Sequence, residues 1–121
     1  MTDRSLETVT ILGATGSIGR QTLDVLARNP ERYRVLGLTA GHRWRELAEH
    51  CLTWRPPFAA LADEQAAEAL RNHLREAGSH TQVLAGHTGV AEVAALQEAD
   101  TVVAAIVGAA GVRPTLAAVE A

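Results

Sequence analysis

The sequence contains no lysine, and all eleven basic side chains among its 121 residues are arginine. A Schiff-base lysine, a lysine general base and the lysine of a phosphate-binding P-loop are therefore excluded within this chain. Cys51 is the single cysteine, so the chain forms no internal disulfide, and one thiol does not make a zinc site. We expect a reducing compartment, and the absence of an apolar N-terminal signal sequence favours the cytoplasm.

Aromatic residues are also scarce, at 3% of a chain that is 47% hydrophobic. The core must therefore be built mainly from Ala, Val, Leu and Ile, and the length suits one domain. The formal net charge is -3, with both signs interspersed, so we expect neither nucleic acid nor an anionic membrane as a partner. No apolar run is long enough to span a bilayer.

Short apolar runs rich in β-formers alternate with segments of helical period, which is typical of a parallel α/β sheet. The pattern predicts five strands, at 9–12, 35–39, 58–61, 81–85 and 101–106. It predicts helices at 17–29, at 45–52, directly after Asp63 through residues 66–74, and at 90–96, followed by a turn at 108–111 and a last helix containing Pro114.

This alternation predicts a Rossmann-like, doubly wound parallel sheet in three α/β/α layers.

Ile18, Thr22, Val25 and Leu26 share one face of the first helix and are expected to be buried. In the third helix, Ala66, Ala69, Leu70, His73 and Leu74 form the expected apolar face, Asp63 is the expected N-cap, and Glu68 and Arg71 lie three apart on the exposed side. The chain ends within a helix that has no C-cap, so we expect a truncated domain that lacks its last strand or strands.

Three glycines lie between the first strand and the first helix, in Gly13-Ala14-Thr15-Gly16-Ser17-Ile18-Gly19. Gly13 permits a sharp turn, Gly16 lets a pyrophosphate approach the backbone, and Gly19 lets the helix pack closely. Free N–H groups near Ser17 and Ile18, with the Thr15 and Ser17 hydroxyls, would then face the phosphates. The spacing is GxxGxxG rather than GxGxxG, but the strand before it and the helix after it favour a dinucleotide site.

The segment after the second strand, residues 39–45, contains no carboxylate. An NAD site usually places an acidic residue there to bind the ribose 2′-hydroxyl, and such a residue would repel the 2′-phosphate of NADPH. Arg43 is suited to bind that phosphate with paired N–H bonds, and His42 adds a possible donor. The sequence therefore predicts NADPH as the cofactor. His50, His73, His80 and His87 lack ligand spacing and are expected to be structural or surface residues. Trp44 and Trp54 are expected to pack a helix, and stacking on adenine stays an alternative for either.

Two segments resemble one family. Residues 10–19, followed by Thr22-Leu23-Asp24-Val25 and Asn29-Pro30, are similar to the opening of 1-deoxy-D-xylulose 5-phosphate reductoisomerases. Residues 104–111, followed by 114–118, are similar to that family's loop beside the nicotinamide. The resemblance implies that the following residues contact the cofactor: Gly13, Thr15, Gly16, Ser17, Ile18, Gly41, His42, Arg43, Ala105 and Gly108. The family often has Lys or Arg followed by Asn where this chain has His42-Arg43.

The resemblance further implies conversion of 1-deoxy-D-xylulose 5-phosphate to 2-C-methyl-D-erythritol 4-phosphate, an isoprenoid precursor of the methylerythritol phosphate pathway, by isomerisation and NADPH-dependent reduction. A magnesium, manganese or cobalt ion holds the sugar phosphate substrate in the family. The resemblance implies that the metal ligands and catalytic residues lie beyond residue 121, so residues 1–121 would be the NADPH-binding domain, without catalytic or metal-binding residues of its own. It also implies a homodimer for the full-length enzyme, assembled through regions outside this chain.

Three other interpretations stay open from the sequence. Another NADP-dependent enzyme, such as an extended short-chain dehydrogenase or a semialdehyde dehydrogenase, can carry the same glycine turn. A stand-alone nucleotide-sensing module would bind the cofactor without a reaction. A plain α/β scaffold, in which the glycines only make turns, would bind no cofactor at all.

Overall fold

The computed structural model describes residues 6–105 of the chain. This part forms one sheet of five parallel strands in the spatial order β4-β3-β2-β1-β5. The strands are β1 (Glu7–Leu12), β2 (Tyr33–Ala40), β3 (Phe58–Leu61), β4 (Gln82–Ala85) and β5 (Thr101–Ala104). The helices of the described residues are α1 (Ser17–Ala27), α2 (Trp44–Trp54), α3 (Glu64–Glu76) and α4 (Gly86–Ala94). No helix in this range is long and apolar enough to cross a membrane.

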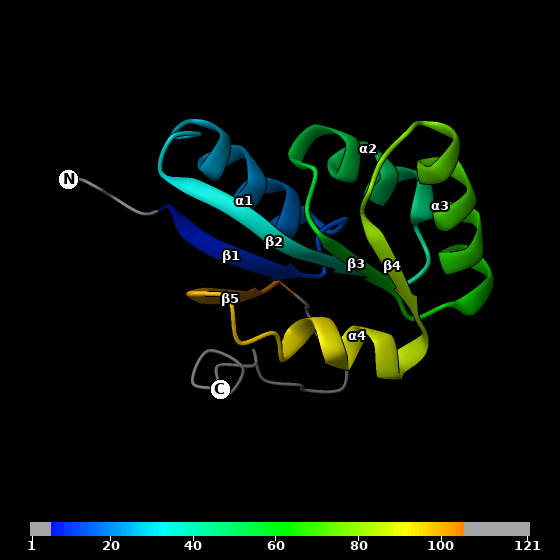
Figure 1. Ribbon diagram of the computed structural model, residues 1–121. Coiled ribbons are helices and arrows are strands. Elements are labelled where there is room, and N and C mark those ends of the chain that lie inside the picture. Colours follow the sequence, from blue (N-terminus) through cyan, green and yellow to red (C-terminus); the bar gives the residue numbers. More distant parts are fainter. Residues whose placement is uncertain (1–5, 106–121) are drawn as a thin grey trace.

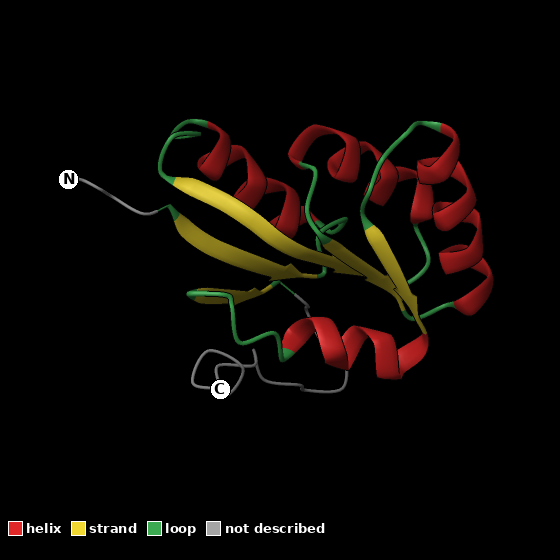
Figure 2. Cartoon of the chain, in the orientation of Figure 1, coloured by secondary structure: helices red, strands yellow, loops and turns green. Residues whose placement is uncertain are grey.

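Helices cover both faces of the sheet, with α1, α2 and α3 on one face and α4 on the other (Figures 1 and 2). The chain advances in one direction from β1 to β4, and α4 then carries it back to β5 beside β1. Because crossovers between parallel strands are right-handed, this reversal places α4 on the opposite face. The predicted doubly wound, three-layer fold is confirmed. Its topological switch point lies between β1 and β5.

The core between the sheet and helices α1 to α3 is aliphatic, as the scarcity of aromatic residues predicts. Ile11, Leu38, Leu47 and Leu61 are completely buried. Each fully buried leucine contributes about 1.5–3 kcal/mol relative to an exposed one. Both tryptophans pack against the margin of this core, which confirms their expected packing role.

The predicted buried face of α1 is wrong in part. Ile18 and Val25 are 46% and 53% exposed, whereas the buried residues are Gly19, Leu23 and Leu26. These three are spaced by four and three positions, so they share one face of the helix. The close packing of Gly19 against the glycine turn fixes the rotation of α1, and Ile18 and Val25 then point away from the sheet.

The N-terminus of α3 follows the prediction, because the Asp63 carboxylate accepts a hydrogen bond of 3.0 Å from the Gln65 amide. Arg71 donates to Glu68 on the exposed side, at 2.6 Å, as expected. Ala66, Leu70 and Leu74 are buried as predicted, but one predicted residue of this face is wrong and one buried residue was not predicted. His73 is exposed and Ala67 is completely buried. A face read from apolar spacing included His73 because it lies three residues after Leu70.

Helix α4 begins four residues before its predicted start at residue 90. Gly86, with φ of 80°, turns the chain from β4 directly into the helix. A Cβ on Gly89 would lie 2.8 Å from the Leu84 Cβ, so this glycine allows close packing against the end of β4. Tertiary packing thus overrides the low helix propensity of two glycines. The end of the fifth strand at Ile106, the turn at 108–111 and the last predicted helix lie outside the described residues.

Candidate functional site

The glycine turn is tied to the end of the neighbouring strand. Gly13 adopts φ of 80°, in the left-handed region that favours glycine. Its amide donates to the Thr39 hydroxyl and to the Thr39 carbonyl, both at 3.1 Å, and the Ala14 amide donates to the same carbonyl at 2.8 Å. Thr39 is 2% exposed, so these bonds are protected from water. The turn is therefore held in one position at the carboxyl ends of β1 and β2.

Gly19 is required by the fold itself. A Cβ at this position would collide with the Gly13 carbonyl oxygen and would lie 2.7 Å from the Ala14 Cα. Both are backbone atoms that cannot rotate out of the way. The prediction that Gly19 permits close helix packing is confirmed, and its contact is the turn at the end of β1.

Gly16 and Gly41, by contrast, are not required by the packing of the described residues. A Cβ on Gly16 would lie 3.7 Å from the Gly13 carbonyl oxygen, which is an ordinary van der Waals distance, and a Cβ on Gly41 would have no atom within 4 Å. Neither residue has positive φ. The absence of side chains at these positions leaves open space at the edge of the sheet instead of relieving strain.

Both glycines line a cleft of about 390 Å³ at the carboxyl ends of the strands. Ligands of open α/β sheets bind at this edge, next to the topological switch point. Residues of β2 and α4, together with the segments that follow β1, β2, β3 and β5, form its walls: Gly13, Gly16, Thr39, Ala40, Gly41, Ala62, His87, Val90 and Ala105.

Of the predicted cofactor-contacting residues, Gly13, Gly16, Gly41 and Ala105 are brought together in this cleft. Ala105 is 5% exposed and donates its amide to the Leu12 carbonyl at 2.8 Å, which sets the end of β5 beside the glycine turn.

The other predicted residues surround the cleft without lining it. Thr15 is buried below the turn, and Ile18 is exposed on α1. Ser17 opens onto the groove between α1 and α2. His42 and Arg43 are exposed beyond the end of β2. Gly108 lies outside the described residues.

The helix N-termini at this edge differ in their capping. Asp63 caps α3, whereas α1, α2 and α4 have no side-chain cap. The first amides of a helix lack partners within the helix and carry partial positive charge, so an uncapped N-terminus is suited to an anion. At α1 the N-cap position is Gly16, which adds no side chain between these amides and the cleft.

Arg43 is the N-cap residue of α2, and a carboxylate lies close to it. Its Nη1 atom is 3.8 Å from the Glu46 Oε1 atom, one helical turn away. Residues 39–45 contain no carboxylate, but Glu46 lies one position beyond this segment. Its position next to Arg43 was therefore not predicted from the sequence. Arg45 is engaged elsewhere, because its guanidinium lies 5.2 Å from the centre of the Trp44 ring.

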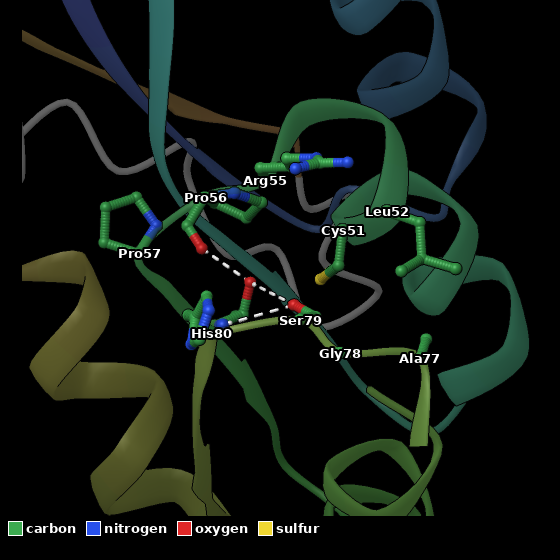
Figure 3. Close-up of a pocket in the computed structure, with 10 residues that line it drawn as sticks. Cys51, Leu52, Arg55, Pro56, Pro57, Ala77, Gly78, Ser79 and His80 are labelled. Atoms are coloured by element: carbon green, nitrogen blue, oxygen red, sulfur yellow. Dashed lines mark hydrogen bonds between the residues drawn. The ribbon is translucent and has the colours of Figure 1, made fainter. Parts of the chain in front are cut away.

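A second cavity, of about 290 Å³, lies at the opposite end of the sheet (Figure 3). It is formed by the C-termini of α2 and α3 and the segments that enter β3 and β4. The Thr81 hydroxyl donates to the Pro56 carbonyl at 2.7 Å and lies 3.2 Å from the Ser79 hydroxyl. The polar groups of Pro56, Ser79 and Thr81 are thus hydrogen-bonded to one another.

Cys51 lies in the wall of this second cavity and is expected to be unreactive in the folded chain. Burial raises the pKa of its thiol from 9.0 to about 12. At pH 8 only about one thiol in ten thousand is then ionised. A colourimetric thiol reagent at pH 8 is expected to modify the unfolded chain within minutes and the folded chain only at the rate of unfolding. Rapid modification of the native chain would contradict this burial.

The raised pKa of the Cys51 thiol makes the stability of the folded chain depend on pH. A thiol whose pKa is raised by folding contributes stability that is complete below pH 9 and is lost as the pH rises toward about 12.

No group of three or more His, Cys, Asp or Glu side chains within residues 6–105 is arranged to hold a metal ion. His50 is half-buried, whereas the other four histidines are exposed. Burial lowers its pKa, partly opposed by the nearby Glu49 and Glu46 carboxylates, and its Nε2 atom is enclosed without a hydrogen-bond partner. The described residues therefore do not fit a divalent cation.

The fold, the glycine turn and the cleft at the switch point define a Rossmann-type α/β domain. The family described as 1-deoxy-D-xylulose 5-phosphate reductoisomerase matches residues 9–121, and the chain belongs to this family. The enzyme of that name from Nitrosomonas europaea is 54% identical over 110 residues, and the one from Pseudomonas fluorescens is 55% identical over 116. The matches cover 91% and 96% of this chain, but only 27% and 29% of those proteins.

Solved structures of the family share the fold. A reductoisomerase from Zymomonas mobilis in complex with NADPH superimposes with a TM-score of 0.83 at 42% identity, over 94% of this chain and 29% of that one. A second reductoisomerase, in complex with NADPH, fosmidomycin and magnesium, gives 0.81 at 40% identity, over 88% and 26%. Membership in this family excludes the short-chain and semialdehyde dehydrogenase interpretations.

Proposed function

We propose that this chain is the NADPH-binding domain of an enzyme that converts 1-deoxy-D-xylulose 5-phosphate to 2-C-methyl-D-erythritol 4-phosphate. The observation that carries the proposal is the pair Gly16 and Gly41, which the packing does not require and which line one cleft at the switch point. The pyrophosphate binds at the uncapped start of α1, with Gly13, Thr15, Ser17 and Ile18 around it.

The remaining contacts are assigned from the two ends of the cleft, one at Gly41 after β2 and the other at Ala105 after β5. Gly41, His42 and Arg43 surround the adenosine 2′-phosphate, and Ala105, with Gly108 beyond it, lies toward the nicotinamide. NADPH supplies a hydride when bound, and the chain orients it. Because residues 6–105 gather no metal ligands, the proposal assigns the divalent cation, the substrate and the dimer contacts to the rest of a longer, cytoplasmic protein.

The test is a calorimetric titration of the 121-residue chain with NADPH and, separately, with NADH. A charge-assisted hydrogen bond contributes about 1.5–3 kcal/mol, so Arg43 is expected to favour NADPH by roughly ten- to a hundred-fold. The Arg43→Ala variant is expected to lose this preference. Arg45→Ala is the matched control, because it removes a neighbouring guanidinium that lies over Trp44, and it is expected to keep the preference.

Other outcomes separate the alternatives. Equal affinity of the unsubstituted chain for both cofactors would contradict the 2′-phosphate site and leave the dinucleotide site standing. A folded sample that binds neither would favour the plain scaffold. Tight binding by a protein whose full-length form turns over no sugar phosphate would favour a nucleotide-sensing module.

A further inference from the structure

Arg43 and Glu46 lie close enough for an ion pair, but no hydrogen bond joins their side chains. Their 3.8 Å separation is too long for a hydrogen bond, and the two side chains are 58% and 45% exposed. The Glu46 Oε1 atom is itself enclosed and accepts no hydrogen bond within the described residues. A carboxylate in this state holds the guanidinium by charge alone, so a better anion can displace it.

We propose that Glu46 is a selectivity residue for the cofactor, an internal anion that competes with the 2′-phosphate for Arg43. The inference rests on the proposed function, because it assigns the 2′-phosphate to Arg43. A dianionic phosphate offers the guanidinium paired, charge-assisted bonds, which the Glu46 carboxylate does not form. Binding of NADPH then breaks the pair and brings the phosphate near a like charge, whereas NADH carries no 2′-phosphate and does neither.

Glu46 therefore lowers the preference for NADPH below what Arg43 alone would give. Two like charges several ångströms apart at a surface repel enough to change affinity about three- to ten-fold at low salt. The carboxylate also lies in the first turn of α2, where it stabilises the positive end of that helix. That structural role affects the stability of the chain, but it does not affect the ratio of the two cofactor affinities.

The experiment compares Glu46→Gln with the unsubstituted chain by calorimetric titration with NADPH and with NADH, at low and high salt. Glu46→Gln is expected to tighten NADPH binding about three- to ten-fold, to change NADH binding less than about two-fold, and to lose most of this gain at high salt. Glu49→Gln is the matched control, because Glu49 is an exposed carboxylate on the same helix that forms no ion pair within residues 6–105. It is expected to leave both affinities unchanged.

An unchanged or lower ratio of NADPH to NADH affinity in Glu46→Gln, in a chain that itself prefers NADPH, would overturn the inference and leave the proposed function intact. Weaker NADPH binding would show that Glu46 orients Arg43 instead of competing for it, which also overturns the inference. If the unsubstituted chain shows no preference for NADPH, the 2′-phosphate assignment fails, and this inference fails with it.

Discussion

Gly19→Ala is expected to destabilise the domain by about 3 kcal/mol, against the intrinsic preference of a helix for alanine. The added methyl group meets the Gly13 carbonyl oxygen and the Ala14 backbone, and neither can move as a side chain would. Relief requires α1 to shift away from the turn, which lifts Leu23 and Leu26 out of the core. Urea unfolding followed by far-ultraviolet circular dichroism measures the change.

The direction of the change in stability distinguishes a steric conflict at Gly19 from the intrinsic helix propensity of alanine. At a helix position without steric conflict, replacing glycine by alanine stabilises by up to about 1 kcal/mol. Gly41→Ala is the control, because an added Cβ there has no atom within 4 Å, and its free energy of unfolding is expected to change by less than about 0.5 kcal/mol. An unchanged or raised midpoint for Gly19→Ala would show that α1 does not pack on the turn as described.

The fold could be predicted from the sequence because each buried parallel strand is a short apolar run, bounded by residues that break it. Asp63 and the pair formed by Glu68 and Arg71 follow local rules, and the structure places them as predicted. The buried face of α1 could not be obtained in this way. Apolar spacing favours Ile18 and Val25, whereas the contact that fixes the helix is made by Gly19, which has no side chain to count.

Only some of the residues that line the cleft could be predicted from the sequence. Gly13, Gly16 and Gly41 carry a recognisable pattern, but Ala62, His87 and Val90 have no signature that distinguishes them from surface residues. They reach the cleft because parallel strands end at one edge and because α4 starts directly after β4. Only the strand order, which sequence periodicity does not supply, brings these residues together.

The proximity of Glu46 to Arg43 depends on where α2 begins. With the helix predicted from residue 45, the two residues are not expected to face one another. Because α2 begins at Trp44, Arg43 becomes its N-cap and Glu46 lies in its first turn, three residues along. The difference of one residue between the predicted and the observed start of α2 therefore decides whether the arginine has a neighbouring carboxylate.

Gly16→Ala is expected to show the opposite behaviour to Gly19→Ala, with a stable fold and a lost ligand. Its Cβ would lie 3.7 Å from the Gly13 carbonyl oxygen, so only the cost of alanine at the N-cap of α1 is expected, a loss of no more than about 1 kcal/mol in the free energy of unfolding. The methyl group would, however, occupy the cleft wall at the start of α1, where a phosphate must approach the backbone amides. A steric conflict of about 3 kcal/mol corresponds to binding weaker by about a hundred-fold.

Because the pyrophosphate is common to both cofactors, Gly16→Ala is expected to weaken NADPH and NADH equally, whereas Arg43→Ala affects NADPH alone. Calorimetric titration of the two variants with both cofactors therefore separates the pyrophosphate contact from the 2′-phosphate contact. Unchanged affinity of a folded Gly16→Ala chain for both cofactors would mean that the phosphates do not approach the start of α1. The open space beside Gly16 and Gly41 would then need a different ligand, because the packing of the described residues does not account for glycine at either position.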